Sequence, residues 1–311
     1  MTVLIEASHL SRYYGAHCAV DDISFTLKQG EVMGLLGPNG AGKTTTMQML
    51  CGNLAPSRGQ IRINGIDLLD RPKQAKRHLG YLPDTPPLYR DLTINEFLTY
   101  CAALHGVEKT GIPAVVKRAR ERCGLDAMQN RLIGNLSKGY QQRTGIAQAI
   151  LHNPQVIVLD EPTVGLDPLQ IREIRALIRD LGREHGIILS THILTEVEES
   201  CTHVQIIHQG RLILNETIAG LQRQMHSCTL EVITRTRPDL KALSALPGVL
   251  LVEPMADNRL YVHHGVHDNP AKQLAELIVA SGWGLEELAP VKKSLEDVFI
   301  QLTRETAVHS G

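Results

Sequence analysis

The eight residues GPNGAGKT at positions 37–44 constrain the fold of this chain more than any other stretch. They match the pattern G-x-x-x-x-G-K-[ST] at every fixed position. The apolar segment Glu31–Leu36 before them is typical of a short strand, and the segment from Lys43 to Cys51 after them is typical of a helix. A strand, a glycine-rich loop and a helix in this order predict a loop that wraps phosphate groups.

The composition of this loop follows from what a phosphate cradle needs. Backbone N–H groups must point inward around the phosphates, and side chains at Gly37, Gly40 and Gly42 would obstruct them. The start of the following helix adds unpaired N–H groups and the positive end of a dipole. Lys43 supplies a charge for the β- and γ-phosphates, and the Thr44 hydroxyl can ligate Mg²⁺. The rest of the predicted nucleotide-binding set is Pro38, Asn39, Ala41 and Thr45.

A second motif, QVIVLDEP at positions 155–162, supplies a pair of acids after a buried strand. Asp160 at the strand end is placed to hold Mg²⁺ directly or through water. Glu161 can accept a proton from an attacking water molecule. The amphipathic helix that follows and the apolar segment GIILS from Gly186 complete a βαβ unit, which predicts a mainly parallel core sheet.

Other parts of the chain predict three further features. Residues 84–150 show helical patterns without strands, which indicates a helical subdomain inserted into the sheet. Residues near 61–66 and 204–215 predict hairpins on an antiparallel β flank. From residue 221 the pattern β-α-β-β-α-β, ending in the helix SLEDVFIQLTRE, predicts a small α+β C-terminal accessory domain with a ferredoxin-like split βαβ unit. We therefore expect an α/β domain over residues 1–220 and an accessory domain over 221–311.

Composition narrows the class of protein. The formal net charge of −1 gives no electrostatic argument for binding nucleic acid or anionic lipid. The six cysteines include no Cys-x-x-Cys pair, which argues against a zinc site and a disulfide framework. The longest apolar runs fall far short of the roughly 18 residues that a membrane span needs, and the N-terminus lacks the pattern of a secretory signal.

The motifs GPNGAGKTT, LSKGYQQR, VIVLDEP, GLD and STH occur in this order. With them, residues 3–220 resemble the nucleotide-binding subunit of ATP-binding-cassette (ABC) transporters, a P-loop NTPase cassette. The chain is most similar to the exporter-type subunits of the gliding-motility, sodium-efflux and drug-resistance group, which carry a similar C-terminal domain ending in a phrase like SLEDVF. The resemblance implies an ATPase that uses ATP and Mg²⁺.

The stretch LSKGYQQR corresponds to the signature loop of that family, which contacts ATP bound to the other copy of a head-to-tail dimer. Ser137 is placed to cap the helix GYQQRTGIAQAIL, whose start offers N–H groups to an anion, which the resemblance identifies as a γ-phosphate. The resemblance implies that Ser137, Lys138, Gly139 and Tyr140 complete the partner's site. The chain departs from the common form LSGGQ at Lys138 and Tyr140, and Lys138 would add positive charge near the partner's phosphate.

Four other positions take roles from the same resemblance. Tyr14 in SRYYG matches the aromatic residue that stacks on adenine, with Tyr13 as the alternative. His192 in STH matches the switch histidine that contacts the γ-phosphate, and Asp167 in GLD matches the residue that crosses the dimer seam. Asp84 stands where the family usually carries a glutamine that contacts Mg²⁺ and water. A carboxylate could still bind Mg²⁺, with a shorter reach.

The leading hypothesis is an ATP-hydrolysing transporter subunit whose dimer closure powers a separate transmembrane permease, with export favoured over import. Glu161, His192 and Lys43 are its expected catalytic residues. The permease would hold it at the cytoplasmic face of the inner (plasma) membrane, docked on the segment DTPPLYRDLTINEF. The alternative is a soluble cassette ATPase that remodels ribosomes or nucleic acid. For residues 221–311, a dimerisation or docking platform is favoured over a small-ligand sensor.

Overall fold

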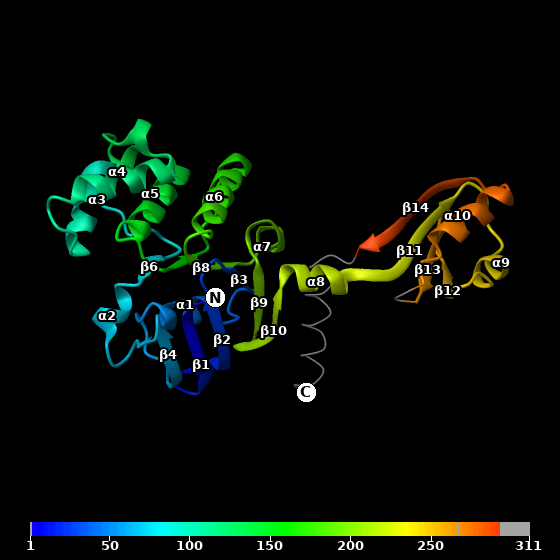
Figure 1. Ribbon diagram of the computed structural model, residues 1–311, viewed down its shortest axis with the longest axis horizontal. Helices are drawn as coiled ribbons and strands as arrows, with labels where there is room; N and C mark the ends of the chain where they lie inside the picture. Colours follow the sequence, from blue (N-terminus) through cyan, green and yellow to red (C-terminus); the bar gives the residue numbers. More distant parts are fainter. Residues whose placement is uncertain (1, 266–267, 293–311) are drawn as a thin grey trace. The chain divides into compact units, whose positions relative to one another are not determined.

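The structure, a computed structural model, describes residues 2–265 and 268–292 of the chain. Its contacts divide the chain into two compact units, Met1–Ile218 and Ala219–Gly311 (Figure 1). Each unit has its own apolar core, so each is described by itself. Within the described residues, no helix is long and apolar enough to cross a bilayer.

The first unit is built on a six-stranded sheet. Its strand order is β10 (Arg211–Thr217), β9 (His203–His208), β3 (Val32–Leu36), β8 (Gly186–Thr191), β7 (Val156–Asp160) and β6 (Leu79–Leu82). All neighbouring pairs are parallel except β9 and β10. Every residue of β3, β7 and β8 is buried, as expected for strands covered on both faces. Because parallel strands end at the same edge, the residues after β3, β7 and β8 meet there.

A second, four-stranded antiparallel sheet packs against the first. Its order is β2 (His17–Lys28), β1 (Val3–Tyr14), β4 (Arg58–Ile63) and β5 (Ile66–Asp67). An apolar cluster shared by both sheets and by α1 (Lys43–Leu50) fills the space between them, and it includes Leu10, Leu35, Met47 and Ile188. This packing brings the β1–β2 turn to the loop that follows β3.

The two predicted hairpins lie in different sheets. The hairpin near residues 61–66 is present as β4 and β5 in the antiparallel sheet. The hairpin at 204–215 forms as β9 and β10, but its predicted place on the antiparallel flank is wrong, because it extends the six-stranded sheet. The four central residues of β9 are buried, and the strand pairs in parallel with β3. The apolar strand is therefore covered within the core sheet, which the local turn pattern alone does not predict.

Three helices form the predicted helical subdomain. They are α3 (Ile94–Leu104), α4 (Ile112–Cys123) and α5 (Lys138–Ile150), which contact one another and lie grouped together in Figure 1. A capping box between Thr93 and Glu96 starts α3. The unit also contains α2 (Pro72–Lys76), α6 (Pro168–Leu181) and α7 (Leu194–Ser200). Strand β6 joins the subdomain to the core sheet, since its Gly80 lies directly against α5.

The second unit contains α8 (Ile218–Met225) at its boundary, β11 (His226–Thr234), α9 (Leu240–Ser244), β12 (Val249–Pro254), β13 (Arg259–His264), α10 (Ala271–Ala280) and β14 (Leu285–Lys292). The sheet order is β12-β13-β11-β14 with all pairs antiparallel. From β11 onward this is the arrangement of the predicted split βαβ unit. Leu230, Val262 and Leu274 lie in its core. The predicted final helix at 294–305 lies outside the described residues.

Candidate active site

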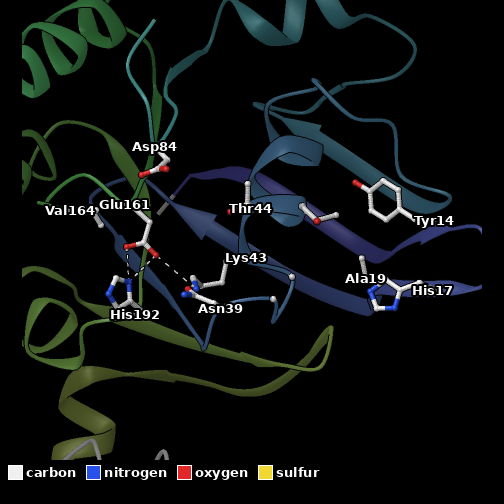
Figure 2. Close-up of a pocket in the computed structure, with 13 residues that line it drawn as sticks. Tyr14, His17, Ala19, Asn39, Lys43, Thr44, Asp84, Glu161, Val164 and His192 are labelled. Atoms are coloured by element: carbon white, nitrogen blue, oxygen red, sulfur yellow. Dashed lines mark hydrogen bonds and ion pairs between the residues drawn. The ribbon is translucent and has the colours of Figure 1, made fainter.

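A cavity of about 590 Å³ opens where the loop after β3 meets the ends of β7 and β8 (Figure 2). It is lined by Tyr14, His17, Ala19, Asn39, Gly40, Gly42, Lys43, Thr44, Thr45, Asp84, Glu161, Val164 and His192. These residues come from both sheets, so neither sheet forms the cavity alone. Tyr14 and His17 flank the β1–β2 turn at one end of the cavity, and Glu161 and His192 lie at the other.

The glycines of the loop are required by the protein's own backbone as well as by any ligand. A Cβ atom on Gly37 would lie 2.3 Å from the carbonyl oxygen of Ile207, and one on Gly42 would lie 2.6 Å from that of Ala19. Gly40 and Gly42 also have positive φ angles of 78° and 107°. The loop therefore folds against β9 and β2 only when these positions carry no side chain.

The helix that follows the loop begins without a side-chain cap. Gly42 is the N-cap of α1, no side chain accepts a hydrogen bond there, and the first turn carries no acidic residue. The first N–H groups of a helix have no partner within the helix. In α1 they stay available to an anion, and the helix dipole adds to their attraction. Thr44 and Thr45 in this turn both line the cavity.

The Lys43 side chain is buried and held by the loop. Its Nζ atom donates hydrogen bonds to the carbonyl oxygens of Gly37 at 2.8 Å and Pro38 at 3.2 Å. It also lies 3.8 Å from the Glu161 carboxylate, and both side chains are largely buried, with 7% and 14% exposed. Burial lowers the pKa of Lys43, while the negative charges of Glu161 and Asp160 oppose that shift. The ammonium group is thus fixed in place at the cavity wall.

Asp160 ends β7 and lies behind the cavity wall. It is only 2% exposed, and one of its carboxylate oxygens accepts a hydrogen bond of 2.5 Å from the Ser190 hydroxyl. Burial raises the pKa of Asp160, and the hydrogen bond from Ser190 opposes that effect. The negative charge of Asp84 raises it further. A cation bound between the carboxylates of Asp160 and Asp84 would relieve this repulsion.

Glu161 is held in a strained position. Its φ angle of 47° is unusual for a residue other than glycine and costs about 1–3 kcal/mol. Its backbone N–H donates to the same Ser190 hydroxyl at 3.0 Å. The carboxylate lies between Lys43 and the Nδ1 atom of His192, which is 3.0 Å away, as the dashed lines in Figure 2 show. The backbone conformation thus turns the carboxylate toward the cavity.

His192 is half-exposed, and its ring faces the same carboxylate. Because a carboxylate can only accept, Nδ1 carries the proton in this contact and Nε2 is left for another partner. Chemically, the cavity combines anion-binding N–H groups, a fixed ammonium group and a carboxylate that can accept a proton from water. A histidine beside that carboxylate can contact a bound phosphate.

The two tyrosines of SRYYG are separated by the structure. Tyr14 lines the cavity, and the Arg12 guanidinium lies 5.0 Å from the centre of its ring. Tyr13 does not line it, and its ring is approached by Arg58 instead. Successive residues of a strand point to opposite faces, which explains the difference. Tyr14 is therefore the tyrosine available to a ligand in this cavity.

Other predicted residues lie outside the cavity within one chain. Gly37 and Pro38 contribute carbonyl groups to Lys43, and Ala41 is buried. Asp167 caps α6, where its carboxylate accepts from the N–H of Gln170 at 2.9 Å. None of the signature residues lines the cavity: Ser137, Lys138, Gly139 and Tyr140.

The signature residues begin α5 as the sequence predicts. The Ser137 hydroxyl accepts a hydrogen bond from the N–H of Tyr140 at 3.4 Å, so it caps the helix. A Cβ atom on Gly139 would lie 2.6 Å from the side chain of Gln170, and one on Gly165 would lie 2.2 Å from the Lys138 ammonium. The start of α5 therefore packs against the start of α6 and the loop before it in the same chain.

Sequence reasoning missed four contributors to this region. His17, Ala19 and Val164 line the cavity, and Ser190 joins Asp160 to the N–H of Glu161. His17 and Ala19 reach the cavity through the pairing of β1 with β2, and Ser190 through the register that places it opposite Asp160. The motif STH could have indicated Ser190, because it places a hydroxyl group at the end of a strand beside Asp160 and Glu161.

Comparisons with known proteins point to one family. A family model described as ABC transporter matches residues 20–164. The bacitracin transport ATP-binding protein BcrA of Bacillus licheniformis is 35% identical over 97% of this chain and 98% of its own length. The ABC transporter ATP-binding protein NatA of Bacillus subtilis (strain 168) is 39% identical, over 69% of this chain and 88% of its own.

A solved structure of an ATP-binding subunit of an ABC transporter matches with a TM-score of 0.64 and 35% identity, over 71% of this chain and 92% of that one. The predicted cassette fold is thereby confirmed. The chain belongs to the ATP-binding subunits of ABC transporters, the family that hydrolyses ATP to drive transport.

Proposed function

We propose that this chain binds Mg-ATP in the cavity between its two sheets and hydrolyses it with Glu161 as the general base. The observation that carries the proposal is the position of the Glu161 carboxylate, 3.8 Å from Lys43 and 3.0 Å from His192 at the cavity rim. The N–H groups of the loop and of α1 bind the phosphates, and Lys43 offsets their charge. Tyr14 stacks on the adenine, a contact worth on the order of 1–3 kcal/mol.

Residues around the cavity also suit a magnesium ion. Mg²⁺ binds through one or two carboxylates and substrate phosphates, and it would polarise the γ-phosphate. Thr44 and Asp84 line the cavity, and Asp160 lies behind them with its pKa raised by burial and by Asp84. Among the described residues no group of three His, Cys, Asp or Glu side chains could hold a metal ion. Phosphate oxygens of the nucleotide and water would complete the ligand set.

The active unit is a head-to-tail dimer of two such chains. In this arrangement, Ser137 and its neighbours at the start of α5 cover the nucleotide held by the other copy. One observation supports the dimer. The start of α5 offers anion-binding N–H groups, yet it does not line the cavity of its own chain, so these groups are available to a nucleotide bound by a second copy. Asp167 at the start of α6 lies along the seam. ATP then favours closure because it binds the closed pair better than the open one.

The closed dimer acts on a separate membrane permease, which holds the chain at the cytoplasmic face of the membrane. The segment that begins at Asp84 is the proposed docking surface, and a cavity of about 490 Å³ beside it is lined in part by Pro86, Leu88 and Arg90 and by Lys138, Gln141 and Gln142 of α5. Tyr89 on the same segment is more than half exposed. Export is the favoured direction, since relatives of this chain are named for bacitracin and multidrug transport.

Glu161→Gln tests this function directly. The amide keeps the shape of the side chain but cannot accept a proton, so phosphate release falls by at least about 100-fold. Nucleotide binding persists, and light scattering after size exclusion in Mg-ATP shows a stable dimer. Glu184→Gln is the control, because Glu184 is an exposed acid outside the cavity. Sustained turnover by Glu161→Gln, or a strictly monomeric protein with bound ATP, would contradict the proposal.

A further inference from the structure

A buried carboxylate outside the cavity joins the two segments that carry Glu161 and His192. Glu196 on α7 is only 2% exposed. One of its oxygens accepts a hydrogen bond from the Thr163 hydroxyl, and the other accepts one of 2.5 Å from the Thr191 hydroxyl. A buried carboxylate without such donors would be costly, so these bonds fix all three side chains.

The two threonines hold different parts of the site. Thr163 lies two residues after Glu161, in the loop that leads to Asp167. Thr191 directly precedes His192, and its hydroxyl also accepts from the N–H of Ile193 at 3.0 Å. Both threonines are buried. Glu196 therefore spans the gap between the loop that presents the carboxylate and the strand end that presents the histidine.

Helix α6 is a third segment that contacts α7 near Glu196. Arg175 on α6 lies 4.0 Å from one oxygen of Glu196 and 2.6 Å from the exposed Glu199 on α7. Arg179, one turn further along α6, donates to the carbonyl oxygen of Glu199 at 3.0 Å. Helix α6 begins at its cap Asp167. Three segments thus converge on α7, and two of them carry the cavity residues Val164 and His192.

We propose that Glu196 is a positioning residue for hydrolysis, which keeps Glu161 and His192 in mutual contact; this inference rests on the proposed function of that site. Glu161 has a strained backbone and needs surrounding structure to hold it. The Ser190 hydroxyl fixes its N–H, and the Thr163–Glu196–Thr191 bonds fix the loop after it against the strand end beside it. Glu196 does not line the cavity and touches no substrate.

Glu196→Ala tests the inference in the full-length chain. We expect the kcat for phosphate release to fall by about 10- to 100-fold, because small displacements of a catalytic group carry losses of this size. The Kd for ATP should change by less than about twofold, since the loop and α1 are untouched. Glu196→Gln should recover most of the kcat, because its amide can accept from Thr191 and donate to Thr163.

Glu199→Gln is the matched control, since it removes an exposed acid from the same helix and the same arginine. It should leave kcat unchanged. Thr163→Val and Thr191→Val remove single hydroxyls and should each lower kcat. Either change combined with Glu196→Ala should cost no more than Glu196→Ala alone, because the residues act through one network. These valine variants also decide the question if Glu196→Ala does not fold.

Two failures are distinguishable in the same assay. If the wild type hydrolyses ATP and Glu161→Gln does not, the proposed function stands. A kcat for folded Glu196→Ala or for both valine variants within about twofold of wild type then overturns this inference alone. Equal losses of kcat and nucleotide affinity would also overturn it, because they would indicate general damage to the cavity. If Glu161→Gln keeps wild-type turnover, the proposed function itself is wrong.

Discussion

At the residue scale, Lys43 shows how the backbone of a loop can fix a single side chain. Two loop carbonyl groups and Glu161 hold its ammonium group. Burial lowers the pKa of Lys43, and the negative charges of the neighbouring carboxylates oppose that change. A phosphate bound there, as proposed above, would meet a side chain with little conformational freedom left to lose.

Lys43→Ala should therefore weaken ATP binding by about 10- to 100-fold, the range expected for losing hydrogen bonds to a charged group. Equilibrium titration with a fluorescent ATP analogue measures the Kd. Lys117→Ala is the control, because Lys117 is an exposed lysine paired with Glu121 on α4. An unchanged Kd for Lys43→Ala would remove this residue from the phosphate site.

The sequence was enough to predict the residues that belong to short contiguous motifs. GPNGAGKT and VIVLDEP place Lys43 and Glu161 near each other because parallel strands end at one edge of a sheet. Ser190 lies in the STH motif, but neither its partner nor that of Glu196 could be assigned in the same way. Their partners, Asp160 and Thr163, are about 30 positions away, and the contacts depend on the register of β7 against β8 and on the fold of α7.

At the element scale, close packing of backbones fixes how the helical subdomain meets the core sheet. A Cβ atom on Gly80 in β6 would lie 2.1 Å from the carbonyl oxygen of Ala149 in α5. That oxygen belongs to the backbone and cannot move aside without displacing the helix. Since α5 begins with the signature residues, the approach of β6 to α5 also sets where those residues lie relative to the sheet.

Gly80→Ala should lower the free energy of unfolding by about 1–3 kcal/mol through overpacking. Urea titration followed by far-ultraviolet circular dichroism measures it. The control is Gly111→Ala in the same unit, where a Cβ atom would meet nothing closer than 3.4 Å and φ is −87°. That change should stay within about 0.5 kcal/mol. Equal free energies of unfolding for the two variants would show that α5 can shift to accommodate the added methyl group.

Helices and buried strands were predictable because their apolar patterns are local. The β9–β10 hairpin was also visible in the sequence, yet its sheet was not, because hairpin geometry says nothing about which strand lies beside it. In the structure, β9 joins β3 and extends the core sheet. The choice depends on packing between segments about 170 positions apart, such as the bonds between Val32 and Thr202.

At the scale of the whole molecule, the chain consists of two units with separate cores. The solved structure of an ATP-binding subunit matches 71% of the chain, whereas the BcrA relative matches 97% of it. The segment beyond the cassette is therefore shared with a full-length relative. The order of its elements was predictable from the sequence; its task was not, since no motif in it specifies a ligand.

We propose that the cassette is self-sufficient for nucleotide binding. Deletion of residues 221–311 should leave a folded protein whose Kd for ATP is unchanged, because every residue that lines the cavity lies in the first unit. Titration with the fluorescent analogue, repeated on the full-length chain, makes the comparison. Loss of binding in a truncated protein that keeps its secondary structure would show that the second unit shapes the cavity.

In the proposed dimer, the contacts of Gly139 with Gln170 and of Lys138 with Gly165 would couple the residues that face the other copy to the loop after Glu161 in their own chain. In a symmetric dimer, ATP hydrolysis at one site would shift the loop after Glu161. Through these contacts it would also move the start of α5, which covers the nucleotide bound to the other copy. The two halves would then turn over in a correlated order.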